Sequence, residues 1–424
     1  MRKVLLLSFI ALVGSYSFIA CNDEIGDEIT QKIAEPTSDY YQPYDSALAI
    51  ALRLLNDCYP GTRSHIQRTV KEHYVYSPSP STRATETDPV RFHVINFENG
   101  QGFAIVSADK RTTPVYAYSS TGNIDLQDAI QYSGVGEFME CAELYFQDEI
   151  ERFGGGPLIP FDPDSSLIDL MVQTPVIING VECVYRIVNV PDSTFGPLLT
   201  TEWHQRDPFN RFCPVRLDDQ GEQVRCPAGC GPVAIGQIMA YHQHPANYGS
   251  SVFNWDAIRS SSNVSPNDTC KARLVSIIGN VANVSYGLNG TGITDNNVRQ
   301  AFLQMGYSAS YLQFYSSETP QLIKSNIREM KPLAFMGFDN DASPRNGHVW
   351  VVDGYQIMAN RTIYYRAVYP YNEIVTTHTN YTQLYYHCNF GGGEDSSANG
   401  FFLNVHENIY RYGIEYIADI TPID

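Results

Sequence analysis

The sequence lacks an excess of basic residues. It contains 28 Lys and Arg residues against 46 Asp and Glu residues, which gives a formal net charge of −18. Proteins that bind DNA or RNA neutralise phosphates with Lys and Arg, so this balance argues against nucleic acid as a partner. Hydrophobic residues make up 43% of the chain and charged residues 17%, a composition typical of globular proteins. A length of 424 residues predicts two domains, each with its own core.

Regular cysteine spacing and long hydrophobic runs are also missing. The nine cysteines are scattered, and an odd number leaves at least one of them unpaired in any intrachain scheme. The apolar run at residues 4–13 is too short for a stable membrane span. Because this run follows Arg2 and Lys3 and precedes small residues, it predicts an export signal at residues 1–20.

The end of this signal indicates a lipid anchor. Phe18-Ile19-Ala20-Cys21 resembles the bacterial lipobox, whose cysteine becomes the lipid-modified N-terminus of a lipoprotein. We therefore predict lipidation at Cys21, with simple secretion as the alternative. The acidic residues 21–43 would form a tether. We expect a protein exported from a bacterial cell, where it is either anchored by lipid at the envelope or released.

Residues 44–190 are predicted to form a small α+β domain that contains no catalytic constellation. Hydrophobic periodicity and turn residues indicate a helix, a hairpin, a third strand and a second helix, in that order. These elements are expected at residues 44–57, 91–97 with 103–107, 115–119, and 137–153.

The junction with the second domain is predicted from composition. The Gly- and Pro-rich residues 154–166 indicate a domain boundary, residues 167–190 have strand character, and residues 191–196 indicate a further loop. Either loop is a candidate site for cleavage by a protease. The second domain is predicted to cover residues 191–424.

The stretch at residues 226–245 gives the strongest indication of function. Its apolar pattern predicts a helix that begins near Cys230, accepts Pro232 in its first turn and ends before Pro245. The unpaired N–H groups and dipole at a helix N-terminus favour an anion, so a thiol there loses its proton more readily. Two flanking glycines leave the sulfur uncovered. We therefore predict that Cys230 is a nucleophile.

Three other interpretations of this stretch remain. A lone cysteine is often only a small core residue. A zinc site built from Cys226, Cys230, His242 and His244 is disfavoured, because the two histidines lack the separation of three to five residues found in such sites. A redox pair of Cys226 and Cys230 has one spacer residue more than the Cys-x-x-Cys motif. A general base elsewhere in the chain would favour the nucleophile.

The second half of the sequence offers partners for this thiol. His348 begins a β-rich run after Asn-Gly, which suits a base that projects from a strand end. Gln205 precedes the cysteine and carries an amide that can donate to an oxyanion. Asn389, shielded by Phe390, is the predicted orienter of the imidazole, and Asp353 is the alternative.

Four motifs in this order resemble the streptopain family of papain-like cysteine peptidases. They are Gly-Pro-Leu-Leu-Thr-Thr-x-Trp-x-Gln, Gly-Cys-Gly-Pro-Val-Ala-x-x-Gln-Ile-Met, Gly-His-x-x-Val-x-Asp-Gly and His-x-Asn-aromatic-Gly, which begin at residues 196, 229, 347 and 387. The first half is similar to the propeptide of that family, chiefly at residues 102–109 and 115–119. The resemblance covers nearly all of the chain after the signal.

The resemblance implies a secreted zymogen whose propeptide blocks the active site until proteolysis removes it. The implied fold is α+β, with a papain-like peptidase of two subdomains, a helical layer and a twisted antiparallel sheet, preceded by a small α+β propeptide domain. The family pattern makes Cys230 the nucleophile, His348 the base and Gln205 the oxyanion donor. It also assigns Gly292 and Gly347 to the substrate cleft.

The chain departs from the family pattern at two places. His204 stands where the family usually has Gly between Trp and Gln. At residues 389–393 the chain has Asn-Phe-Gly-Gly-Gly where the family commonly has Asn-Trp-Gly-Trp-Gly-Gly. The loss of tryptophan affects the shielding of the imidazole but removes no group that does chemistry.

We therefore expect a cysteine endopeptidase made as an inactive precursor, with protein or peptide substrates and with its own propeptide as inhibitor. The reaction requires neither a metal nor another cofactor, and a membrane is expected as a partner only through the lipid anchor. Two alternatives remain open. One is a papain-like surface binding module that has lost catalysis, and the other is an acyl transferase that uses the same two residues.

Overall fold

The computed structural model describes the chain in segments. These are residues 20–21, 40–59, 67–77, 90–124, 134–153, 176–259, 269–313, 316–338, 347–368, 371–392, 398–405 and 413–423. The predicted boundary at residues 154–166, most of the export signal and most of the tether lie outside these segments. Within them, no helix is long and apolar enough to cross a membrane.

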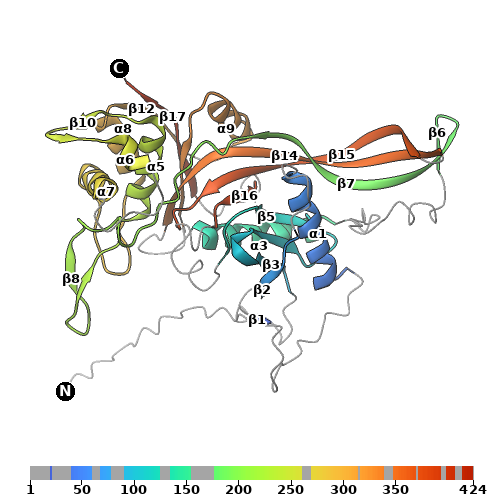
Figure 1. Ribbon diagram of the computed structural model, residues 1–424, viewed down its shortest axis with the longest axis horizontal. Helices are drawn as coiled ribbons and strands as arrows, with labels where there is room; N and C mark the ends of the chain where they lie inside the picture. Colours follow the sequence, from blue (N-terminus) through green and yellow to red (C-terminus); the bar gives the residue numbers. More distant parts are fainter. Residues whose placement is uncertain are drawn as a thin grey trace, which may run out of the picture.

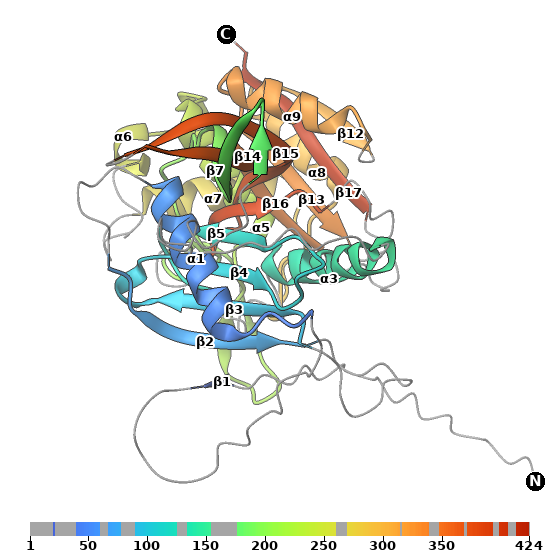
Figure 2. The same cartoon turned by 90° about the vertical axis from the view of Figure 1, so that its right-hand side faces the viewer.

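The N-terminal unit, residues 40–153, is an antiparallel sheet with two helices, as the sequence predicts. Helix α1 crosses the face of β3 and β4 (Figure 2), and its buried residues, among them Ile50 and Leu54, recur at helical spacing. The elements of this unit are α1 (Tyr44–Cys58), β2 (Val70–Tyr76), β3 (Phe92–Phe97), β4 (Phe103–Ser107), β5 (Val115–Ser119) and α3 (Gly134–Arg152). The two-residue strand β1 (Ala20–Cys21) pairs with β2.

The C-terminal unit, residues 197–423, begins with a helical layer. Helix α5 is almost entirely buried because α6, α7 and α8 pack around it. Together they enclose a core that includes Trp203. The helices of this unit are α5 (Cys230–His242), α6 (Trp255–Arg259), α7 (Cys270–Val281), α8 (Asp295–Gln304) and α9 (Thr319–Arg328).

A large antiparallel sheet packs against this layer. Its central strands β14 and β15 are unusually long and extend well beyond the helices as an arm (Figure 1). The strands of this unit's sheet are β12 (Tyr307–Gln313), β13 (Leu333–Phe338), β14 (Gly347–Val368), β15 (Tyr371–Asn389), β16 (Gly400–Leu403) and β17 (Gly413–Pro422). Two small hairpins, β8 (Val215–Leu217) with β9 (Gln223–Arg225) and β10 (Asn247–Tyr248) with β11 (Ser251–Val252), lie outside it. The fold is α+β, as predicted.

The connection between the two units contains a strand where a loop was expected. Strand β7 (Val181–Phe195) pairs with β14, and β6 (Val176–Ile178) pairs with β7 at the end of the arm. The prediction of a loop at residues 191–196 was therefore wrong. Pro191 had favoured a loop, but it lies where the β7–β14 register shifts, and proline is tolerated at such irregularities of an outer strand. The predicted domain boundary at residue 191 thus falls inside β7.

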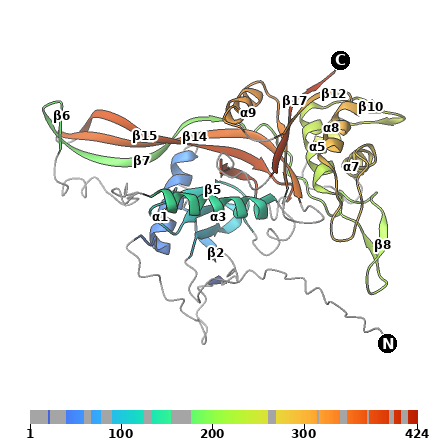
Figure 3. The same ribbon diagram turned by 180° about the vertical axis from the view of Figure 1, so that it is seen from behind.

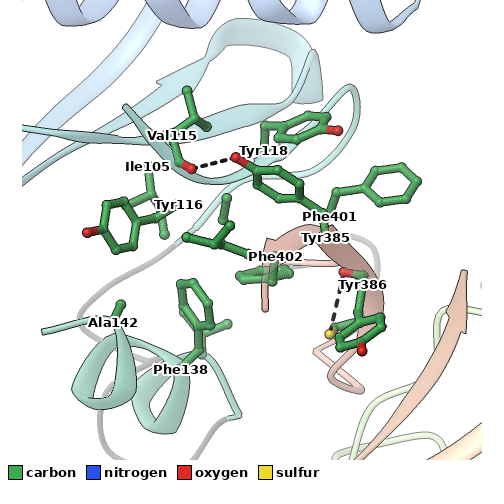
Figure 4. Close-up of a cluster of buried hydrophobic side chains, with 14 of the residues drawn as sticks. Ile105, Val115, Tyr116, Tyr118, Phe138, Ala142, Tyr385, Tyr386, Phe401 and Phe402 are labelled. Carbon is green, nitrogen blue, oxygen red and sulfur yellow. Dashed lines mark hydrogen bonds between the residues drawn. The ribbon is translucent and has the colours of Figure 1, made fainter. Parts of the chain in front are cut away.

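The two units share one sheet, which the sequence did not indicate. Strand β5 pairs with β16, with Tyr118 opposite Phe401 and Ala117 opposite Phe402. The result is a sheet that runs from β1 through β5 and β16 to β12. Figure 4 shows aromatic side chains from β5, α3, β15 and β16 meeting in one buried cluster at this junction.

The arm gives the N-terminal unit a second surface on which to pack. The hydroxyl of Tyr385 donates to the carbonyl of Val115 at 2.7 Å, and the amide of Gln383 donates to the hydroxyl of Thr113 at 2.8 Å. Helix α3 lies along the same side of the long strands (Figure 3). The N-terminal unit is therefore held at both the edge and the face of the C-terminal sheet.

Candidate active site

Cys230 is the first residue of α5, as predicted. Gly229 precedes it with φ 95°, a left-handed conformation that favours glycine, and a Cβ there would lie 3.0 Å from Thr291. The thiol sulfur of Cys230 accepts a hydrogen bond from the backbone N–H of Val349 at 3.3 Å. This contact joins the helix that carries the thiol to the strand that carries His348.

The electrostatics of the thiol differ from the expectation. Burial raises the pKa of Cys230 above its ordinary value, and the hydrogen bonds from the backbone N–H groups of Val349 and Gly231 oppose this only in part. The helix N-terminus is present, but loss of solvent outweighs its effect. In this state of the protein the neutral thiol is therefore favoured over the thiolate.

His348 lies near the start of β14, opposite Gly337 of β13. Its side chain is buried, and Nε2 lies 2.9 Å from the carbonyl oxygen of Phe390, so Nε2 carries the proton and donates. Burial lowers the pKa of His348, although the carboxylate of Glu137 and the Phe390 carbonyl oppose the shift. A neutral imidazole is therefore favoured.

The structure brings Cys230 and His348 to neighbouring positions, but Nε2 of the imidazole faces a carbonyl instead of the thiol. Val349, the residue after His348, supplies the hydrogen bond that the sulfur accepts. The predicted pair therefore lies at one site, while its two members are each bonded to backbone groups. With the proton of the neutral ring on Nε2, Nδ1 is the nitrogen that can accept the proton of the thiol.

Helix α3 of the N-terminal unit packs directly on this histidine. A Cβ on Gly134 would lie 2.2 Å from the Phe390 ring and 2.9 Å from Cδ2 of His348, so only glycine allows this approach. One turn later, Oε2 of Glu137 lies over Gly337, where a Cβ would approach it to 2.3 Å. The start of α3 therefore occupies the space beside the imidazole.

Gln205 is held close to the nucleophile by its backbone. Its carbonyl accepts a hydrogen bond from the N–H of Ala228 at 2.8 Å, two residues before Cys230. The side chain is only partly buried. This position suits the predicted oxyanion donor, whose role remains a prediction.

Asn389 does not contact the imidazole through its amide. Its Nδ2 donates to the carbonyl of Thr201 at 2.8 Å and to Oε1 of Gln237 at 3.3 Å. Its Oδ1 accepts from Nε2 of Gln237 and from the N–H of Gly391, each at 3.2 Å. The predicted orienting role therefore finds no hydrogen bond in this state, because the amide is already fully used.

The alternative orienter, Asp353, has different partners too. Its carboxylate is fully buried, accepts from the N–H of Leu199 at 2.7 Å and lies 2.6 Å from Nδ1 of His387. Asp353 thus fastens the segment before Trp203 to the sheet.

Of the two glycines predicted at the substrate cleft, one lies in a loop beside the turn before Cys230 and the other begins strand β14. Gly292 exchanges two backbone hydrogen bonds with Ser285, and a Cβ on it would meet no atom within 4 Å. Its neighbour Thr291 donates to the carbonyl of Pro227 at 2.6 Å, which brings this loop against the turn before Cys230. Gly347 is exposed and begins β14.

Other predicted residues lie away from this site. Cys21 pairs with His73 between β1 and β2, and its lipidation remains a prediction. Nε2 of His244 lies 3.0 Å from the carbonyl oxygen of Gly306, and His242 packs on Tyr307. The part of the chain that the structure describes contains no group of three or more His, Cys, Asp or Glu residues arranged to hold a metal ion.

The residues that surround His348 could not be predicted from the sequence. Gly134 and Glu137 come from the other unit, and no spacing rule links them to His348. The role of the Phe390 carbonyl is a backbone feature without a residue signature. Gln237 lies within one of the four motifs, so its place in the pattern was visible although its function was not.

Comparison with known proteins agrees with this geometry. Residues 203–402 match the model of the peptidase C10 family, and residues 30–144 match that of the Spi protease inhibitor. The chain belongs to the streptopain family of cysteine peptidases. The inhibitor-like segment covers most of the N-terminal unit, including α1, β2–β5 and the first half of α3.

Individual relatives are distant. The chain is 22% identical over 338 residues to the thiol protease/hemagglutinin PrtT of Porphyromonas gingivalis, covering 70% of this chain but only 36% of that protein. It is 22% identical over 304 residues to streptopain of Streptococcus pyogenes, covering 62% and 67%. A prointerpain A fragment of Prevotella intermedia has the same fold, with a TM-score of 0.52 and 17% identity over 84% of this chain and 100% of that one.

Proposed function

We propose that this protein is the zymogen of a papain-like cysteine endopeptidase that hydrolyses peptide bonds through Cys230 and His348. The observation that carries the proposal is the packing of Gly134 and Glu137 of α3 against His348, which fills the space beside the imidazole. A peptidase that must stay inactive before export needs such a block. The N-terminal unit, which has the Spi inhibitor pattern, is the inhibitor.

Latency in this proposal has an electrostatic cause as well as a steric one. Burial shifts the pKa of Cys230 upward and that of His348 downward, so both groups are neutral. Both shifts disfavour the thiolate–imidazolium pair. Removal of α3 would readmit water to the histidine and make the thiolate–imidazolium pair more stable.

The reaction then follows from the side chains. The thiolate of Cys230 attacks the carbonyl carbon of the peptide bond, and the oxyanion accepts hydrogen bonds from the Gln205 amide and the Cys230 N–H. The imidazolium of His348 gives its proton to the leaving amine as the C–N bond breaks. Water then attacks the thioester and gives one proton to the imidazole, and as the C–S bond breaks the carboxylic acid is released and the thiolate–imidazolium pair is restored.

The extent of each part is also a proposal. The export signal covers residues 1–20, with Cys21 as the lipidation site and residues 21–43 as a tether. The propeptide extends from residue 44 to a point before the helical layer, and the peptidase follows. Gly292 and Gly347 line the substrate cleft, a placement that the position of the Gly292 loop beside Cys230 supports.

The test is a comparison of the full chain with its Cys230→Ala variant. After removal of the propeptide by an added protease, the unsubstituted protein should cleave casein and react with iodoacetamide at Cys230. The variant should do neither and should not process itself. If the variant cleaves casein as fast as the unsubstituted protein, Cys230 is not the nucleophile.

Two further outcomes separate the alternatives. Folded, processed protein that neither cleaves casein nor reacts with iodoacetamide at Cys230 would be a binding module without catalysis. Products whose mass includes an added amine would identify an acyl transferase. Product masses measured with and without the amine distinguish transfer from hydrolysis.

A further inference from the structure

Gln237 joins three segments of the active site although it lies outside the reacting groups. It lies seven residues after Cys230, which is two turns along α5. Its side chain is completely buried, with 0% of its surface exposed. A neutral amide in such a place is stable only when its hydrogen-bonding groups are satisfied.

The partners of this amide come from two segments next to the reacting groups, the loop before Gln205 and the end of strand β15. Oε1 of Gln237 accepts from the backbone N–H of Trp203 at 3.1 Å and from Nδ2 of Asn389 at 3.3 Å. Nε2 of Gln237 donates to Oδ1 of Asn389 at 3.2 Å. The two side-chain amides therefore face each other as a pair, with donor and acceptor matched on both sides.

Each of the two segments also contains a residue that acts at the site. Trp203 lies two residues before Gln205, and Asn389 lies one residue before Phe390, whose carbonyl bonds His348. Asn389 also joins the two segments directly, since its Nδ2 donates to the carbonyl of Thr201 at 2.8 Å. The amide pair thus connects helix α5, which carries Cys230, to both segments. It does not touch the space where a substrate would lie.

We propose that Gln237 is a positioning residue that, paired with Asn389, fixes the helix of Cys230 relative to the segments that carry Gln205 and Phe390. The proposal rests on the peptidase function proposed above. It reassigns Asn389 from a partner of the imidazole to a partner of the helix. Displacements of about 1 Å among reacting groups lower rates by roughly 10²-fold, so a loosened pair should mainly lower kcat.

Two substitutions of Gln237 make the proposal testable. Gln237→Met keeps the approximate length of the side chain and removes every hydrogen bond. Gln237→Glu keeps the shape but replaces the NH₂ donor with an oxygen that faces Oδ1 of Asn389. When ionised, the introduced carboxylate repels that oxygen, and when protonated, its O–H can donate to it.

The measurement is kcat and KM of the processed enzyme, per active site titrated with an irreversible thiol reagent, between pH 5 and pH 8. We expect Gln237→Met to lower kcat about 10²-fold at every pH with little change in KM. Gln237→Glu should lower kcat similarly at pH 8 and less at pH 5, because burial raises the pKa of a carboxyl. Gln304→Glu, at the exposed end of α8, is the control and should match the unsubstituted enzyme.

The outcomes separate positioning from simple folding. A structural role alone would lower the yield or the melting temperature while kcat per titrated site stayed within about twofold of the unsubstituted enzyme. That result would overturn the proposal, as would equal kcat ratios for Gln237→Glu at all pH values. If neither variant folds, the amide is a folding determinant and the positioning role is likewise rejected.

A readout that does not need peptidase activity keeps this test independent of the proposed function. The rate of alkylation of Cys230 by iodoacetamide depends on the thiolate and on its approach to His348. Gln237→Met should lower this rate and shift its pH profile. An unsubstituted enzyme with a reactive Cys230 but no proteolysis would reject the proposed function while leaving the role of Gln237 to be decided by the alkylation profile.

Discussion

Two of the contacts between the N-terminal unit and the C-terminal unit differ in kind. At the junction of β5 with β16, backbone pairing and a cluster of aromatic rings bury a large apolar surface. At the start of α3, a glycine and a carboxylate approach one histidine. Under the function proposed above, the first contact provides affinity and the second provides inhibition, so different residues set how tightly the inhibitor binds and where it acts.

This division has a physical basis. Apolar burial stabilises in proportion to area and tolerates many side chains, whereas a block of a catalytic residue requires one precise approach. A change in the aromatic contact should therefore alter how long the unit stays bound. A change at Gly134 should alter how well the bound unit blocks.

Phe138→Ala should have the largest effect. Phe138 is buried on α3, and its ring lies edge-on to Phe402 with centroids 4.8 Å apart. Removal of a buried Phe side chain costs about 3–5 kcal/mol, so the zymogen should unfold at lower urea and be processed faster. Urea titration of this variant in a Cys230→Ala background checks it, since self-cleavage is then prevented. An unchanged midpoint would show that α3 is anchored elsewhere.

Gly134→Ala tests the blocking contact with a smaller expected effect. The added methyl would lie 2.2 Å from the Phe390 ring, and such overpacking typically costs about 1–3 kcal/mol. Because α3 must move away, His348 should gain freedom. We expect Cys230 of the unprocessed zymogen to be alkylated faster while the unit stays attached.

Gly136→Ala, on the same helix turn, is the comparison variant for that experiment. It changes helix propensity in the same way, but a residue two positions along a helix does not face the same side as Gly134. Equal alkylation rates for the two variants would contradict the separation of the two contacts.

Acid should produce the smallest effect. His73 and His93 of the N-terminal unit lie 3.0 Å apart, Nε2 to Nδ1, and burial together with His93 lowers the pKa of His73 to about 4. A group whose folded pKa is below its unfolded value stabilises the fold fully above pH 6.5, and this contribution is lost as the pH falls toward 4. For His73 the loss at pH 6 is about 0.8 kcal/mol.

Urea midpoints at pH 7.5 and pH 6 measure this loss. His73→Gln keeps a donor toward His93 and removes one titrating group, so its midpoint should fall less over that range. The pKa of His348 is also lowered, which contributes a change in the same direction. Burial and His244 also lower the pKa of His242 to about 4, so a background with both His242→Ala and His348→Ala isolates the N-terminal pair. An equal fall in both proteins would exclude His73 as a source.

Local pattern predicted most of the elements but not how they meet. Helical periodicity found α1 and α3, alternation found β3 and β4, and the glycines and proline around Cys230 placed it at the start of α5. These features depend on neighbours within one or two turns. The pairing of Tyr118 with Phe401 spans more than half of the chain, and no periodicity specifies a partner strand.

At the candidate site, too, the sequence predicted which residues are present but not which contacts they make. Residue type and motif order led to Cys230, His348 and Gln205, whose positions near one another agree with the structure. The role given to Asn389 rested on its chemistry alone, and hydrogen-bond capacity decided against an imidazole contact in this state. The directions of the pKa shifts could not be predicted either, because burial in the folded protein determines them.

Strand β7 has a consequence for how the chain is matured. Its residues from Val184 to Phe195 lie along β14, so a protease that needs an extended, accessible substrate cannot engage them without first peeling the arm apart. A cut ahead of β6 leaves the pairing of β7 with β14 intact. The released enzyme would then begin with a strand inherited from its own linker, and the arm would remain three-stranded after the inhibitor has gone.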